Sequence, residues 1–246
     1  YYCPKDRINP EIIADSVGVN YIYGGYQNFF DGMLVHSANN FHIYINTDRL
    51  ETPYSARARF TFAHELGHYF IDAHRNALEN GLAPAHSSFT NFSSENTVER
   101  EADYFAASLL LPATRFKRDC FKRKFNFNLV KELAQKYQTS ITSTLLRFIV
   151  LDIYPIMVVC SKDNKIKWKW NTDDFPYYYL RDGKDKVPED TAAGEYFARG
   201  EKYRNTEDVF AGDWFSINDR EYDRRFYEHC IYSDERNTVI SVIWED

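Results

Sequence analysis

The chain has 246 residues, of which 44% are apolar and 17% aromatic, so it can bury a substantial hydrophobic core. Its net charge of −6 excludes the overall basic surface of a dedicated nucleic-acid-binding protein, and no apolar run is long enough to cross a membrane. Four cysteines lie far apart without a CxxC pair, which favours reduced thiols and a cytoplasmic protein over a disulfide framework.

The first half of the chain is predicted to be mainly helical, with one clear strand. Residues 8–19 should form a short helix that Pro10 opens, and residues 40–46 alternate between apolar and polar side chains, as a half-buried strand does. A long helix should follow over residues 55–73. The next stretch, residues 76–94, is rich in Asn, Ser, Gly and Pro and is predicted to be a loop.

Another helix should begin near residue 95 or 96 and end at Leu111, because Pro112 cannot continue it. Two further helical segments are expected up to about Leu151.

From residue 152 onwards the sequence becomes acidic and rich in strand patterns. Residues 154–170 predict a hairpin, and residues 238–245 predict a last strand. We therefore expect an α+β protein with a mainly helical first part and a strand-rich C-terminal part.

The stretch FAHELGHYF places His64, Glu65 and His68 at HExxH spacing. In a helix, positions i and i+4 lie on one face, so both imidazoles can reach one zinc ion while the glutamate lies beside them to act on water. The predicted helix is otherwise apolar almost all round, and a buried polar stripe needs a partner, which a metal ion would supply. The alternative is a pair of core histidines bonded to backbone carbonyl groups.

Three residues compete as the third metal ligand. His74 stands six residues after His68, the interval of the longer HExxHxxGxxH pattern, but Ile71 occupies the position where that pattern needs a glycine. If the helix continues, His74 points away from the pair, so we interpret it as a surface histidine at the helix end. The other candidates, Glu99 and Glu101, lie on the following helix.

The apolar arc of that following helix places Glu99 and Asp103 at the edge of its buried face, whereas Glu101 faces water. Two carboxylates that border a buried face need partners. A zinc ion for Glu99 and the N–H group of a ligand imidazole for Asp103 would satisfy both.

Together, RARFTFAHELGHYF and EREADYFAASLLLP resemble the ImmA/IrrE family of metallopeptidases. The resemblance extends over residues 8–151 and, more weakly, into the C-terminal part. It implies a zincin-like metallopeptidase core at residues 1–112 and a helical bundle, helix-turn-helix-like, at residues 113–151. Residues 152–246 would form a strand-rich acidic domain, which in some longer members is a GAF-like sensor.

The resemblance also implies a gluzincin-like site, in which His64, His68 and Glu99 hold a zinc ion, Glu65 is the general base, and Asp103 supports a ligand histidine. Characterised relatives are cytoplasmic endopeptidases that cut a helix-turn-helix repressor and so switch on stress or mobile-element genes. For this chain, the resemblance therefore implies a zinc endopeptidase whose partner is a protein substrate, in the first place such a repressor.

Two finer expectations concern the substrate. The strand at residues 40–46 could lie beside an extended substrate and pair with its backbone. His86, in the loop between the two motifs, is a candidate for stabilising the oxyanion.

The alternative function is a DNA-binding or ligand-sensing regulatory module whose metal site is structural or inactive. Glu65 argues against it, because a structural zinc site has no use for a general base. Residues 129–151 have helix-turn-helix spacing, but Arg147 is the only cation of the second helix, which disfavours DNA binding and favours packing or substrate docking.

Overall fold

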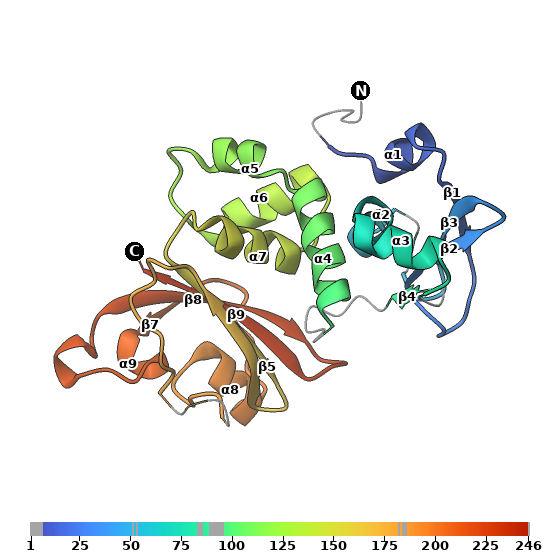
Figure 1. The fold of residues 1–246 in the computed structure, drawn as a ribbon. Helices are drawn as coiled ribbons and strands as arrows, with labels where there is room; N and C mark the ends of the chain where they lie inside the picture. The colour runs from blue at the N-terminus through green and yellow to red at the C-terminus, as the bar shows by residue number, and fades with distance from the viewer. Residues whose placement is uncertain are drawn as a thin grey trace. The chain divides into compact units, whose positions relative to one another are not determined.

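The computed structural model describes residues 7–50, 52, 54–82, 86–88, 96–181, 183 and 186–245, which mix helix and sheet as predicted (Figure 1). The chain divides into two compact units. The first comprises Tyr1–Asp119 and Val130–Thr144, and the second comprises Cys120–Leu129 and Leu145–Asp246. The expected three-part division, with boundaries after residues 112 and 151, stays a prediction.

The first unit contains both helices and strands. They are α1 (Pro10–Ser16), β1 (Asn20–Gly24), β2 (Gly32–Ser37), β3 (Asn40–Asn46), α2 (Ala56–Phe70), α3 (Asp72–Glu79), β4 (His86–Ser88) and α4 (Thr97–Leu110). Three helices follow, and each has residues in both units: α5 (Ala113–Cys120), α6 (Phe127–Tyr137) and α7 (Ile141–Leu151).

The first sheet has the strand order β1-β3-β2-β4, with β1 parallel to β3 and the other neighbours antiparallel. The apolar side of β3 is buried, as its alternation predicts: Phe41, Ile43 and Ile45 share one core with Phe62 and Leu66 of α2. Because β3 pairs with a strand on each side, its backbone groups are already hydrogen-bonded. The expectation that this strand pairs with a substrate is therefore wrong; among the described strands, β4 forms the edge beyond β2.

The single helix predicted over residues 55–73 consists of two helices. Ser55 caps α2, since its Oγ accepts a hydrogen bond from the Ala58 N–H at 3.1 Å. The helix ends at Phe70 because Ile71 takes an extended conformation, with φ −79° and ψ 111°, and α3 begins at the next residue. The chain thus changes direction without a left-handed residue, only three residues before His74.

The helix α4 begins and ends within one or two residues of the predicted bounds. The Asn96 side chain accepts a hydrogen bond from the Val98 N–H at 3.1 Å, and the helix ends at Leu110, shortly before Pro112. Gly67 lets α2 approach α4 closely, because a Cβ at this position would lie only 3.1 Å from the Cα of Ala102.

The second unit contains a five-stranded antiparallel sheet with the order β6-β5-β9-β8-β7. Its elements are β5 (Ile156–Lys162), β6 (Lys165–Asn171), α8 (Ala192–Arg199), β7 (Glu207–Phe210), α9 (Ala211–Trp214), η2 (Asp219–Glu221), β8 (Arg225–Ser233) and β9 (Thr238–Glu245). The predicted hairpin is present: Asp163 and Asn164 join β5 to β6 and both have positive φ, as a two-residue hairpin turn requires. The predicted last strand is β9.

The helices α6 and α7 are joined by a turn at residues 138–140, as their spacing predicts. All six residues from 143 to 148 are buried, and six consecutive residues cover every face of a helix. Since a recognition helix has to expose one face to a DNA groove, this burial disfavours DNA binding by α7.

Candidate metal centre and active site

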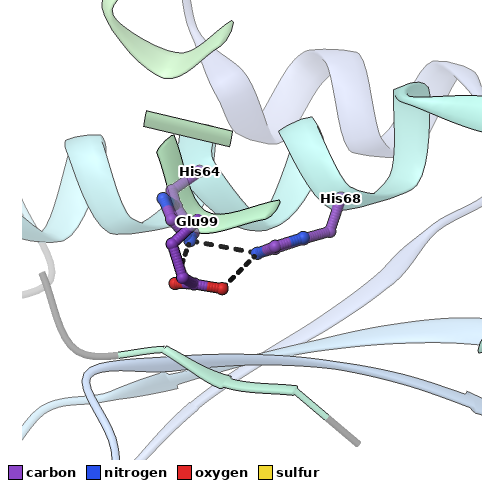
Figure 2. A group of neighbouring side chains, drawn as sticks. All are labelled: His64, His68 and Glu99. Atoms are coloured by element: carbon purple, nitrogen blue, oxygen red, sulfur yellow. Dashed lines mark hydrogen bonds and ion pairs between the residues drawn. The ribbon is translucent and has the colours of Figure 1, made fainter. Parts of the chain in front are cut away.

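Two helices bring three side chains to one point (Figure 2). His64 and His68 project from α2, and Glu99 projects from the first turn of α4. The Nε2 atoms of the two histidines are 3.1 Å apart. The carboxylate oxygens of Glu99 lie 3.3 Å from the Nε2 of His64 and 3.5 Å from the Nε2 of His68. Among the described residues, these three form a group that can hold a metal ion.

The dimensions of this group fit a zinc ion. Ligand distances of about 2.0–2.2 Å in a tetrahedron separate the ligand atoms by about 3.3–3.6 Å, close to the observed separations of 3.1, 3.3 and 3.5 Å. Two imidazoles and one carboxylate also leave a fourth position open, which is typical of catalytic zinc sites. Both histidines are almost completely buried, so their nitrogens need a partner that a cation provides.

Asp103 fixes the orientation of His64. Its Oδ1 lies 2.9 Å from the Nδ1 of His64. When Nδ1 donates its hydrogen to Asp103, the lone pair of the neutral ring is on Nε2. The Nε2 atom faces the other two candidate ligands. Burial lowers the pKa of His64, because it disfavours the charged imidazole. The carboxylates of Asp103 and Glu99 have the larger combined effect and raise this pKa to about 10. A divalent cation that binds at this point therefore has to displace a proton.

Glu65 is completely buried next to the two histidines. Neither of its carboxylate oxygens has a hydrogen-bond partner among the described residues. Burial raises the pKa of Glu65 to about 7, while the charge of His64 and the polar groups of Ser88 and Leu34 act in the opposite direction. A completely buried carboxylate whose pKa burial raises this far is unfavourable for folding, and it is therefore a candidate for a role in chemistry.

Gly32 on β2 makes room for this carboxylate. A Cβ at position 32 would lie 2.6 Å from the Oε1 of Glu65 and 2.5 Å from the Cγ2 of Thr61. No sequence pattern points to Gly32, because only the packing of α2 against β2 reveals why the position lacks a side chain.

The position of His74 differs from the one that the sequence predicts. His74 is not a surface histidine, because it is only 7% exposed, and its Nδ1 lies 3.2 Å from the Nδ1 of His68. Glu101 is exposed, as predicted, but its Oε2 also lies 2.9 Å from the Nε2 of His74. The break at Ile71 explains the difference, because the predicted direction of His74 assumed an uninterrupted helix. The side chain of His86 is outside the described part of the structure.

The histidine pair of α2 and the carboxylate of α4, beside a buried glutamate, form an arrangement typical of zinc metallopeptidases. Residues 42–148 match the model of peptidase family M78, described as an IrrE N-terminal-like domain. This match confirms the predicted resemblance of residues 42–148 to the ImmA/IrrE family.

Two further comparisons bear on the fold. None of the curated proteins matches the chain. A solved structure of a Mycobacterium tuberculosis transcriptional regulator resembles it with a TM-score of 0.59 and 13% identity, over 96% of this chain and 68% of the other. At this identity, the likeness shows a shared fold. Among the described residues, no helix has the length and apolar character needed to cross a membrane.

Proposed function

We propose that this chain is a zinc-dependent endopeptidase that hydrolyses a peptide bond in a protein substrate. The observation that carries the proposal is the meeting of His64, His68 and Glu99 beside the completely buried carboxylate of Glu65. The match to a peptidase family supports the same reaction. A purely structural metal site would not need Glu65, since burying this carboxylate completely costs stability.

Each residue of the site would have a separate role in the reaction. His64, His68 and Glu99 would hold the zinc ion, and Asp103 would keep the His64 ring in the orientation that presents Nε2. Zinc held there supplies Lewis acidity, which activates water and polarises the carbonyl group of a peptide bond. Glu65 takes a proton from the attacking water and delivers it to the nitrogen of the leaving amine.

The substrate we propose is a helix-turn-helix repressor, as the resemblance to the ImmA/IrrE family implies. The regulator among the structural neighbours is consistent with a role in transcriptional control. The competing function, DNA binding by the chain itself, is less well supported because the middle of α7 is buried on all faces.

A cleavage assay with a matched pair of variants tests this proposal. The zinc-loaded protein is incubated with a purified helix-turn-helix repressor from the same organism, and the products are identified by mass spectrometry. Glu65→Gln should retain zinc but cleave at least about 100-fold more slowly, because it cannot accept the proton. Glu235→Gln changes an exposed glutamate of the β8–β9 turn and should cleave at the wild-type rate. Wild-type cleavage by Glu65→Gln, or a wild-type protein that does not bind zinc, would refute the proposal.

A further inference from the structure

A chain of three side chains runs outward from the candidate metal ligand His68. Its Nε2 faces His64 and Glu99, and its Nδ1, on the other side of the ring, lies 3.2 Å from the Nδ1 of His74. The Nε2 of His74 in turn lies 2.9 Å from the Oε2 of Glu101. Both rings are buried, whereas Glu101 is half exposed at the solvent end of the chain.

The direction of the hydrogen bonds in this chain follows from its exposed end. An ionised carboxylate can only accept a hydrogen bond, so the Nε2 of His74 has to carry a proton. A neutral imidazole has one N–H group, so the Nδ1 of His74 is then an acceptor, and the hydrogen it accepts has to come from the Nδ1 of His68. The lone pair of His68 is consequently on Nε2, the atom that faces the other two metal ligands.

The opposite direction of the hydrogen bond between His68 and His74 is unfavourable for metal binding. If the Nδ1 of His74 donated to His68, His74 would carry protons on both nitrogens, with Glu101 as its counter-ion, and the Nδ1 of His68 would be the acceptor. His68 would then have to carry its own proton on Nε2, where it would prevent metal binding. The carboxylate of Glu101 therefore selects the tautomer of His68 through His74.

His74 is not itself a ligand in this arrangement. One of its nitrogens faces the outer side of His68 and the other faces Glu101, so neither points at the group formed by His64, His68 and Glu99. The extended backbone of Ile71 is what allows this contact, because it separates α2 from α3 and gives His74 a direction different from that of a continuous helix.

We propose that His74, held by Glu101, is a positioning residue that fixes the tautomer and orientation of His68 for metal binding. The inference rests on the proposed metal site. In it, His74 accepts a hydrogen bond from the Nδ1 of His68, as Asp103 does from the Nδ1 of His64. Partners of this kind typically contribute about 10–100-fold to metal affinity.

The zinc affinity of four variants, measured by competition with a chelator, tests this inference. His74→Phe keeps an aromatic ring but has no acceptor, and it should raise the zinc Kd about 10–100-fold. His74→Gln should restore most of the affinity, because its carbonyl oxygen can accept from His68 and its amide can donate to Glu101. Glu101→Leu should weaken binding less than His74→Phe does. His42→Phe, a half-buried position on β3, is the control and should leave the Kd unchanged.

A second readout is the tautomer of His68, measured by long-range ¹H–¹⁵N NMR correlation. The wild type should show the Nδ1–H form, and His74→Phe should show a mixture or the Nε2–H form. If the wild type binds zinc and the affinity and tautomer are the same in His74→Phe, this inference is wrong and the proposed function stands. If the wild type does not bind zinc, the proposed function fails, and the tautomer measurement still decides the role of His74.

Discussion

The carboxylate of Glu65 occupies a space that a glycine on the neighbouring strand leaves open. Gly32 is not in a left-handed conformation, so its value lies in the missing side chain and not in backbone freedom. The catalytic role proposed for Glu65 thus depends on a residue more than thirty positions earlier in the chain.

Replacing this glycine should damage both stability and activity. In Gly32→Ala the added methyl group meets Glu65 and Thr61, and such overpacking lowers the free energy of unfolding by about 1–3 kcal/mol. We also expect peptide hydrolysis to fall while one zinc ion per chain is retained. Urea denaturation and hydrolysis rates measure the two effects.

Gly18→Ala is the matched control for this substitution. Gly18 has a φ of 73° and no atom within 4 Å of a Cβ position, so its replacement strains only the backbone, by about 1–2 kcal/mol, and should leave hydrolysis unchanged. Equal hydrolysis rates in the two variants would contradict the role assigned to Gly32.

At the scale of single elements, the sequence predicts what depends on local pattern. The start and end of α4, the buried face of β3 and the hairpin at Asp163 follow from caps, alternation and turn residues, and the structure contains all of them. The meeting of Glu99 with the histidines also follows from its place at the edge of an apolar arc.

What the sequence does not predict depends on contacts between elements. No glycine or proline marks the break at Ile71, so the sequence predicts a continuous helix and a direction for His74 that the structure does not have. A helical wheel gives the direction of Glu101 but not the reach of its side chain. The interior position of β3 depends on strand order, which its own alternation does not reveal.

A buried carboxylate also anchors one helix of the second unit. Glu228 accepts hydrogen bonds from the backbone N–H groups of Ala192 and Ala193 at the start of α8, at 2.9 and 3.3 Å, and from the Nε1 of Trp214 at 3.1 Å. The hydroxyl of Ser241 donates a further bond at 2.8 Å. Glu228 therefore ties α8 and α9 to the sheet.

Glu228→Gln should loosen this attachment. The amide group can replace only one carboxylate oxygen as an acceptor, so buried N–H groups lose their partner, and the free energy of unfolding should fall by about 1–3 kcal/mol. Thermal denaturation followed by circular dichroism measures the loss. An unchanged unfolding temperature would show that Glu228 does not anchor α8.

The same residue predicts a pH dependence of stability. Burial raises the pKa of Glu228 above its ordinary value of 4.5. The folded state therefore binds the proton more tightly than the unfolded state, and the stability of the wild type should fall as the pH rises from about 4.5 through the raised pKa. Glu228→Gln has no such group, so the difference in stability between the two proteins should shrink as the pH rises. Parallel pH profiles would contradict this assignment.

At the scale of the whole molecule, the two units are not consecutive pieces of chain. Segments before residue 152 belong to the second unit, where Phe125 packs against Phe148 and Trp244 with ring centroids 5.5 and 5.2 Å apart. The last strand of the chain thus stabilises residues that precede the whole strand-rich part.

Trp244→Ala should therefore destabilise more than its own strand. Trp244 is only 5% exposed, and removing a buried aromatic side chain costs about 3–5 kcal/mol. Hydrogen exchange should show faster exchange in the C-terminal turns of α7 as well as in β9. Trp170→Ala is the control, because its side chain is 40% exposed and its loss should have a much smaller effect. Exchange that increases only in β9 would contradict this view of the second unit.

The most direct test of the central claim is anomalous diffraction from crystals of the zinc-loaded protein, recorded on both sides of the zinc absorption edge. The map should show one strong anomalous peak about 2.0–2.2 Å from the Nε2 atoms of His64 and His68 and from a carboxylate oxygen of Glu99. A peak coordinated by other residues, or a Glu99 side chain turned away from both histidines, would contradict the central claim.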